Sequence, residues 1–132
     1  MRWTPKHKMG IVLAIGDLEN ENIDWKHGDI VTKQMIEGEG VNRYAMPYSA
    51  FEDELRRVEL YEYFYGPMSD TSERKQPICH EHPGVTDLLE SDVRLFEETR
   101  DDLYEPSCLV NWLCFWSRWA LDNALHPVIM NH

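Results

Sequence analysis

Apolar residues in the first part of the chain form short runs that are typical of strands. Gly10–Ile15 is a continuous apolar run rich in β-branched residues and is followed by a Gly-Asp pair, which indicates a buried strand. Ile30–Ile36 and Val41–Tyr48 flank a polar turn with two glycines at residues 37–40. This spacing predicts a β-hairpin. We therefore expect the strands of this protein within residues 9–48.

Helical spacing of apolar residues begins directly after this region. Ser49–Glu52 has the form S-x-x-E, which predicts a capping box whose serine oxygen accepts a backbone hydrogen bond. Apolar residues then recur three and four positions apart until Gly66, which precedes a proline. The pattern predicts a first helix over residues 50–65.

Two further helices are predicted in the second half, after a proline-containing loop over residues 66–84. Residues 85–104 carry one apolar stripe and an acidic opposite face. Residues 107–125 are apolar on most sides, which is typical of a central helix covered by other elements. Ser107 is placed to cap the first turn of this helix. The sequence thus predicts a single α+β domain over residues 1–132. A small antiparallel sheet from the N-terminal half would pack against three helices, and the tryptophan-rich C-terminal helix would be buried.

The charge of the chain is large and unevenly distributed. The formal net charge is −11, and residues 50–105 hold sixteen acids and six bases. Nucleic acids and anionic membranes are bound mainly by cations. This balance therefore argues against direct binding to either and favours a basic protein partner. The alternative is that the charge only keeps the protein in solution.

The acidic face of the helix predicted over residues 85–104 is the candidate binding surface. Residues three or four apart on a helix lie about 5–6 Å apart, so a row of carboxylates there is comparable in spacing with nucleic-acid phosphates. We expect it to contact a basic partner, such as a nucleic-acid-processing enzyme. The candidate partner-binding residues are Glu90, Glu97, Glu98, Asp101, Asp102 and Glu105. The alternative is a solvated face that Arg94 and Arg100 partly neutralise.

The segment from Cys79 to Pro83 is the only candidate for metal chemistry. Its two histidines, His80 and His82, would point to the same side if the segment were extended. The run resembles the His-x-His-Pro sequence of JAMM-type, deubiquitinase-like metalloproteases, which implies a metal-dependent hydrolase. The acid expected after it comes one residue early, at Asp92, and Glu90 stands where that family has a serine. No third ligand stands out, so we expect no metal and no cofactor. The candidate ligands are His80 and His82, with Cys79 beside them; the alternative is an exposed loop with two solvated histidines.

The tryptophans and cysteines suggest a core more than a reactive site. Trp112, Trp116 and Trp119 share a helical face, which indicates core packing; the alternatives are a docking stripe or a homodimer interface. The three cysteines lack a C-x-x-C spacing, and we expect them to be small buried thiols in a reducing, cytoplasmic compartment. Residues 107–125 are too short and too polar for a membrane span.

No motif identifies a reaction, and no catalytic residue can be assigned. These patterns favour a non-enzymatic protein whose acidic helix binds a basic partner. In size and charge it is comparable with phage-encoded inhibitors of bacterial defence and with the immunity proteins of bacterial toxins. Two alternatives remain open: a small metal-dependent hydrolase or metal-binding protein centred on His80 and His82, and a structural homo-oligomer assembled through the tryptophan-rich helix.

Overall fold

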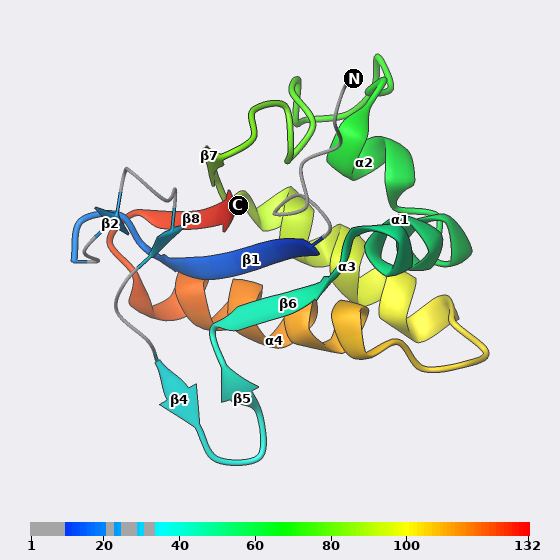
Figure 1. Cartoon of the computed structure of the whole chain (residues 1–132). Helices are drawn as coiled ribbons and strands as arrows, with labels where there is room; N and C mark the ends of the chain where they lie inside the picture. Colours follow the sequence, from blue (N-terminus) through cyan, green and yellow to red (C-terminus); the bar gives the residue numbers. More distant parts are fainter. Residues whose placement is uncertain (1–9, 21–22, 25–28, 31–33) are drawn as a thin grey trace, which may run out of the picture.

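The computed structural model describes residues 10–20, 23–24, 29–30 and 34–132. Within these residues, an antiparallel sheet of four strands has the order β6-β1-β8-β7 (Figure 1). The central strands are β1 (Gly10–Asp17) and β8 (Pro127–Asn131), and the edges are β6 (Arg43–Pro47) and β7 (Gly84–Asp87). The sheet therefore joins the two ends of the described chain.

The central position of β1 follows from its apolar side chains. Ile11, Leu13 and Ile15 are buried in the main core, whereas Ala14 packs with Val128 and Met130 in a second, smaller cluster. Because successive side chains of a strand point to opposite faces, β1 contributes apolar contacts on both faces of the sheet.

Two short ribbons accompany this sheet. The pair β2 (Ile23–Asp24) and β3 (Asp29–Ile30) forms one, and β4 (Met35–Ile36) with β5 (Gly40–Val41) forms the other. The second ribbon confirms the predicted glycine turn. Residues 43–47 instead pair with β1, and residues 31–33 of the predicted hairpin lie outside the described part of the chain.

The described residues form four helices. These are α1 (Tyr48–Arg57), α2 (Tyr61–Tyr65), α3 (Glu90–Asp102) and α4 (Cys108–Asn123). Helix α4 packs against β1 and β8, α1 packs against β1 and β6, and α3 packs against α4. Figure 1 shows α4 running beside the sheet, with α3 on the side of α4 away from the β4–β5 hairpin. The predicted α+β fold with a buried tryptophan-rich helix is confirmed.

The first predicted helix differs from the structure in two ways. Helix α1 follows β6 directly, with Pro47 at its N-cap and no capping bond from a side chain. The predicted capping box is therefore wrong, because Ser49 already lies in the first turn. The helix also ends before Glu59, which has a positive φ of 63°, and the amide of Leu60 bonds back to the oxygen of Leu55 at 2.8 Å. This break divides the predicted helix into α1 and α2.

The second half of the chain supplies two strands that were not expected there. Val85 pairs with Met130 in the β7–β8 ladder, so residues 85–87 extend the sheet and do not begin α3. The prediction that the sheet comes from the N-terminal half is wrong, because β7 and β8 of the second half are two of its four strands. The prediction for the start of α4 is confirmed, since the Ser107 Oγ accepts a hydrogen bond from the amide of Val110 at 3.1 Å.

Candidate functional site

A buried polar network fixes the start of α3. The Asp92 carboxylate accepts hydrogen bonds from the Arg74 Nε at 2.9 Å, from the amide of Leu89 at 2.8 Å and from the Tyr63 hydroxyl. Asp92 is fully buried and Arg74 is 6% exposed. Burial, reinforced by the hydrogen bond to Asp92, raises the pKa of Tyr63, so Tyr63 stays a hydroxyl donor. The network fastens α2 and the loop that carries Arg74 to α3.

A second contact joins α3 to α4 and occupies two of the predicted binding residues. The Arg118 guanidinium donates to both oxygens of Glu90, at 3.1 and 3.0 Å, and to the Glu97 Oε1 at 3.3 Å. The hydrogen bond from Arg118 lowers the pKa of Glu90, and the two carboxylates raise the pKa of Arg118. Glu90 and Arg118 therefore stay charged, and Glu90 and Glu97 serve the contact between the helices.

The other four predicted binding residues lie together at the C-terminal end of α3 and in the loop after it. We call this group the acidic tip; its members are Glu98, Asp101, Asp102 and Glu105, and all are exposed. Asp101 pairs with the neighbouring Arg100 at 3.0 Å. Among the described residues, Glu98 and Asp102 have no ion-pair partner within 4.0 Å. The acidic tip thus keeps most of its charge for solvent or a partner.

The loop that ends the acidic tip is tied to α1. The Arg57 guanidinium lies 3.4 Å from the backbone oxygens of Glu105 and Pro106. It also pairs with Glu54 at 2.7 Å. These contacts hold the loop through its main chain and leave its side chains exposed.

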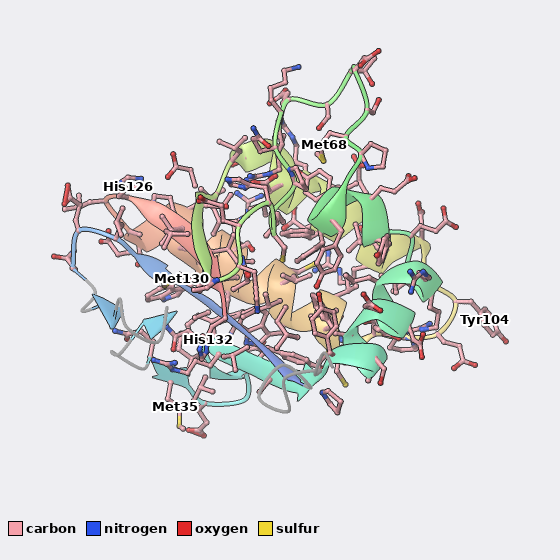
Figure 2. All side chains as sticks on the ribbon, turned by 45° about the horizontal axis from the view of Figure 1, so that its top comes forward. Met35, Met68, Tyr104, His126, Met130 and His132 are labelled. Carbon is pink, nitrogen blue, oxygen red and sulfur yellow. The ribbon has the colours of Figure 1, made fainter. Side chains whose placement is uncertain are left out.

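Tyr104 is a candidate binding residue that the sequence patterns did not reveal. Its side chain is 97% exposed and projects away from the ribbon at the end of the molecule (Figure 2). It stands between Asp102 and Glu105 of the acidic tip. The only signal in the sequence is an aromatic residue two positions before Pro106, after the apolar stripe has ended, and apolar spacing places this position in the helix predicted over residues 85–104.

A groove of about 640 Å³ lies along α4 and is lined by residues of α4, α3 and the β4–β5 turn. Phe115 and Trp119 are its aromatic lining residues, and Glu39 reaches it from the β4–β5 turn. The Trp112 Nε1 donates to the Val41 oxygen at 2.8 Å, which holds this turn beside α4. The other lining residues are Glu97, Arg100, Asn111, Cys114, Arg118, Asp122 and Asn123.

The predicted histidine pair is engaged in two separate contacts. The His80 Nδ1 lies 3.0 Å from the Pro77 oxygen, and the His82 Nδ1 lies 2.5 Å from the Asn131 Oδ1. The part of the chain that the structure describes contains no group of three or more His, Cys, Asp or Glu residues that could hold a metal ion. The described residues therefore do not provide the set of metal ligands that the JAMM-type resemblance implies.

The cysteines and tryptophans are only partly as expected. Burial raises the pKa of Cys79 to about 12 and that of Cys114 to about 11, which keeps both as neutral thiols. Cys108 is exposed, so the prediction of three buried thiols is wrong at the first residue of α4. Trp112 and Trp116 are buried, in agreement with core packing, and Trp119 is partly exposed.

The comparisons with known proteins leave the function open. No family model, no curated protein and no solved structure matches this chain. In the described residues, none of the helices has the length and apolar character needed to cross a membrane.

Proposed function

We propose that this chain is a non-enzymatic binding protein that engages a basic protein partner through the acidic tip and Tyr104. The observation that carries the proposal is a nearly fully exposed tyrosine in the segment of the acidic tip, where Asp101 pairs with Arg100 and the other three carboxylates have no ion-pair partner within 4.0 Å among the described residues. Tyrosine is enriched at interaction hot spots because it combines a large apolar ring with a hydrogen-bonding hydroxyl. The carboxylates around it would attract a basic surface and orient it.

The way in which this surface is held supports the proposal. Arg57 anchors the loop, Arg118 anchors α3 to α4, and Asp92 anchors the start of α3. A surface that is ordered before binding loses less conformational entropy on association. The acids of α3 also divide into two groups. Glu90 and Glu97 pair with Arg118 and stabilise the contact between α3 and α4. Those of the acidic tip remain exposed at the surface.

The partner class that we favour is a basic protein, such as a nucleic-acid-processing enzyme whose cleft normally holds phosphates. The net charge of −11 would speed the encounter with such a protein at low ionic strength. A role as an inhibitor of bacterial defence or as a toxin-immunity protein fits the same chemistry. Assembly through the tryptophan-rich helix is less favoured, because Trp116 is fully buried and Trp112 nearly so.

The test is an affinity capture that compares two variants with the same net charge. In the first variant, Glu98, Asp101, Asp102 and Glu105 are replaced by lysine. In the control, the same replacement is made at four exposed acids elsewhere: Glu19, Glu37, Asp70 and Glu73. We expect a basic protein to be retained by the wild type and by the control, and to be lost from the tip variant and from Tyr104→Ser.

The salt dependence provides a second reading of the same experiment. Association through the acidic tip should slow steeply as salt is raised, because screening shortens the range of charge attraction to about 10 Å at 0.1 M. Equal loss of the partner from the tip variant and the control would show that only net charge matters. Retention by the tip variant would contradict the proposal.

A further inference from the structure

We infer that the groove along α4 receives an arginine side chain of the partner protein. This inference rests on the proposed function and deepens it, since it gives the basic partner a second and more specific point of contact. The groove volume of about 640 Å³ lies within the range of sites that hold small ligands or anchoring side chains. The occupant is identified by the charges and rings of the lining residues.

The aromatic walls of the groove are firmly positioned. The fully buried Trp116 makes edge-to-face contacts with both wall residues: its ring centroid lies 5.1 Å from that of Phe115 and 5.3 Å from that of Trp119. The Asn123 Nδ2 donates to the Trp119 oxygen at 2.8 Å, which fixes the main chain beside the second wall. Rigid aromatic rings of this kind bind cations over their faces.

The charges around the groove favour a cation. Its two basic lining residues are already paired, Arg118 with Glu90 and Glu97 and Arg100 with Asp101. The two other charged lining residues, Glu39 and Asp122, have no ion-pair partner within 4.0 Å among the described residues. The lining residues of the groove hold three carboxylates against two guanidinium groups: Glu39, Glu97 and Asp122 against Arg100 and Arg118.

Arginine fits this arrangement better than lysine does. A guanidinium group is planar, stacks on aromatic rings and donates several hydrogen bonds in fixed directions. It can therefore lie against Trp119 or Phe115 and donate to Glu39 and Asp122. The ammonium group of lysine is more strongly hydrated and has no plane with which to stack. The groove should accordingly discriminate between the two residues.

The test uses the full chain labelled with ¹⁵N and short peptides as probes. A Gly-Arg-Gly amide is titrated against the protein, with Gly-Lys-Gly and Gly-citrulline-Gly amides as controls; citrulline keeps the shape of arginine without its charge. We expect the arginine peptide to shift the Trp119 indole resonance and the amides of Asn111 and Asp122. The lysine peptide should bind more weakly, and the citrulline peptide should cause no comparable shift.

Two glutamates on the same turn provide a matched pair of variants. Glu39 lines the groove and Glu37 does not, and both are exposed. Glu39→Gln and Asp122→Asn should each weaken binding of the arginine peptide by about fivefold. Glu37→Gln, which makes the same charge change two residues away, should leave the affinity unchanged. Each variant is first checked for an unchanged fold by its amide spectrum.

The outcomes separate this inference from the proposed function. Shifts confined to the acidic tip, or equal shifts with arginine and citrulline, would overturn the inference and leave the proposed function standing. If the arginine peptide still shifts the groove resonances of the tip variant, the inference is supported. If the tip variant also still retains the partner in the affinity capture, the proposed role of the tip is contradicted. Equal weakening by Glu37→Gln and Glu39→Gln would also overturn the inference.

Discussion

Trp116 shows most directly how single side chains stabilise this fold. It is fully buried in the main core, and its truncation would leave a cavity between α4 and its neighbours. We expect Trp116→Ala to lower the free energy of unfolding by about 3–5 kcal/mol, measured by urea denaturation. Tyr104→Ala is the matched control, because the 97% exposed side chain of Tyr104 should contribute less than about 0.5 kcal/mol. Similar losses in the two variants would contradict the placement of Trp116.

Asp17 stabilises the connection between α4 and β8 through main-chain hydrogen bonds. Its carboxylate accepts from the amides of Leu125 and His126, both at 2.9 Å. Burial raises the pKa of Asp17, but these donors, with the amide of Glu19 and the side chain of Asn20, outweigh burial, so the pKa lies below its ordinary value of 3.8. The folded state therefore holds this carboxylate in its charged form.

A pH dependence of stability follows from that shift. Because the pKa is lower in the folded state than in the unfolded chain, the contribution of Asp17 is complete above the ordinary value of 3.8 and is lost as the pH falls through the folded-state pKa. Urea denaturation should show that Asp17→Asn lowers stability more at about pH 7 than at about pH 2. Asp70→Asn, at an exposed position, should have little effect at either pH.

The sequence allowed some residue roles to be predicted and concealed others. The burial of Trp116 follows from a helix that is apolar on most sides, because helical periodicity is a local property of the chain. The role of Arg118 depends on Glu90, which is 28 residues away and could be paired with it only once the helix packing was known. Apolar spacing places Tyr104 in the helix predicted over residues 85–104, whereas α3 ends at Asp102, since helix ends are poorly marked by apolar spacing.

At the level of elements, Ser107 at the N-cap of α4 and Ser49 in the first turn of α1 lead to opposite predictions. The Ser107 Oγ accepts from the Val110 amide at 3.1 Å, so Ser107→Ala should lower the free energy of unfolding by about 1 kcal/mol. Ser49 makes no capping bond, so Ser49→Ala should have almost no effect. Chemical denaturation of both variants measures the difference. A larger decrease in the free energy of unfolding for Ser49→Ala than for Ser107→Ala would contradict this expectation and support the capping box that the sequence around Ser49 predicts.

The strands that sequence analysis missed are short and depend on distant partners. β7 has four residues and β8 has five, which is too few for alternation to establish a strand without knowledge of its neighbour. The Val-Thr-Asp segment of β7 also continues into the apolar spacing of α3, so the sequence pattern predicts it as part of that helix. The pairing of Val85 with Met130 decides its conformation, and tertiary contacts of this kind commonly override local preference.

At the scale of the whole molecule, the Arg74–Asp92 pair links segments that are far apart in sequence. Arg74→Met would leave the fully buried Asp92 without its cation and should cost about 3–5 kcal/mol. In a double-mutant cycle with Asp92→Asn, we expect the double variant to be destabilised by less than the sum of the single effects, by about 1–3 kcal/mol. Urea denaturation of the four proteins measures this coupling. Additive effects would show that the two side chains act independently.

The pairing of β1 with β8 also determines when the chain can fold during its synthesis. The register joins Asp17 to Pro127, so at roughly 5–20 residues per second the ribosome adds β8 about 5–20 s after β1. Until then β1 can pair only with β6, and its other edge offers unpaired backbone groups to any neighbouring chain. The newly made protein is therefore exposed to aggregation for an interval that ends only when β8 is inserted between β1 and β7.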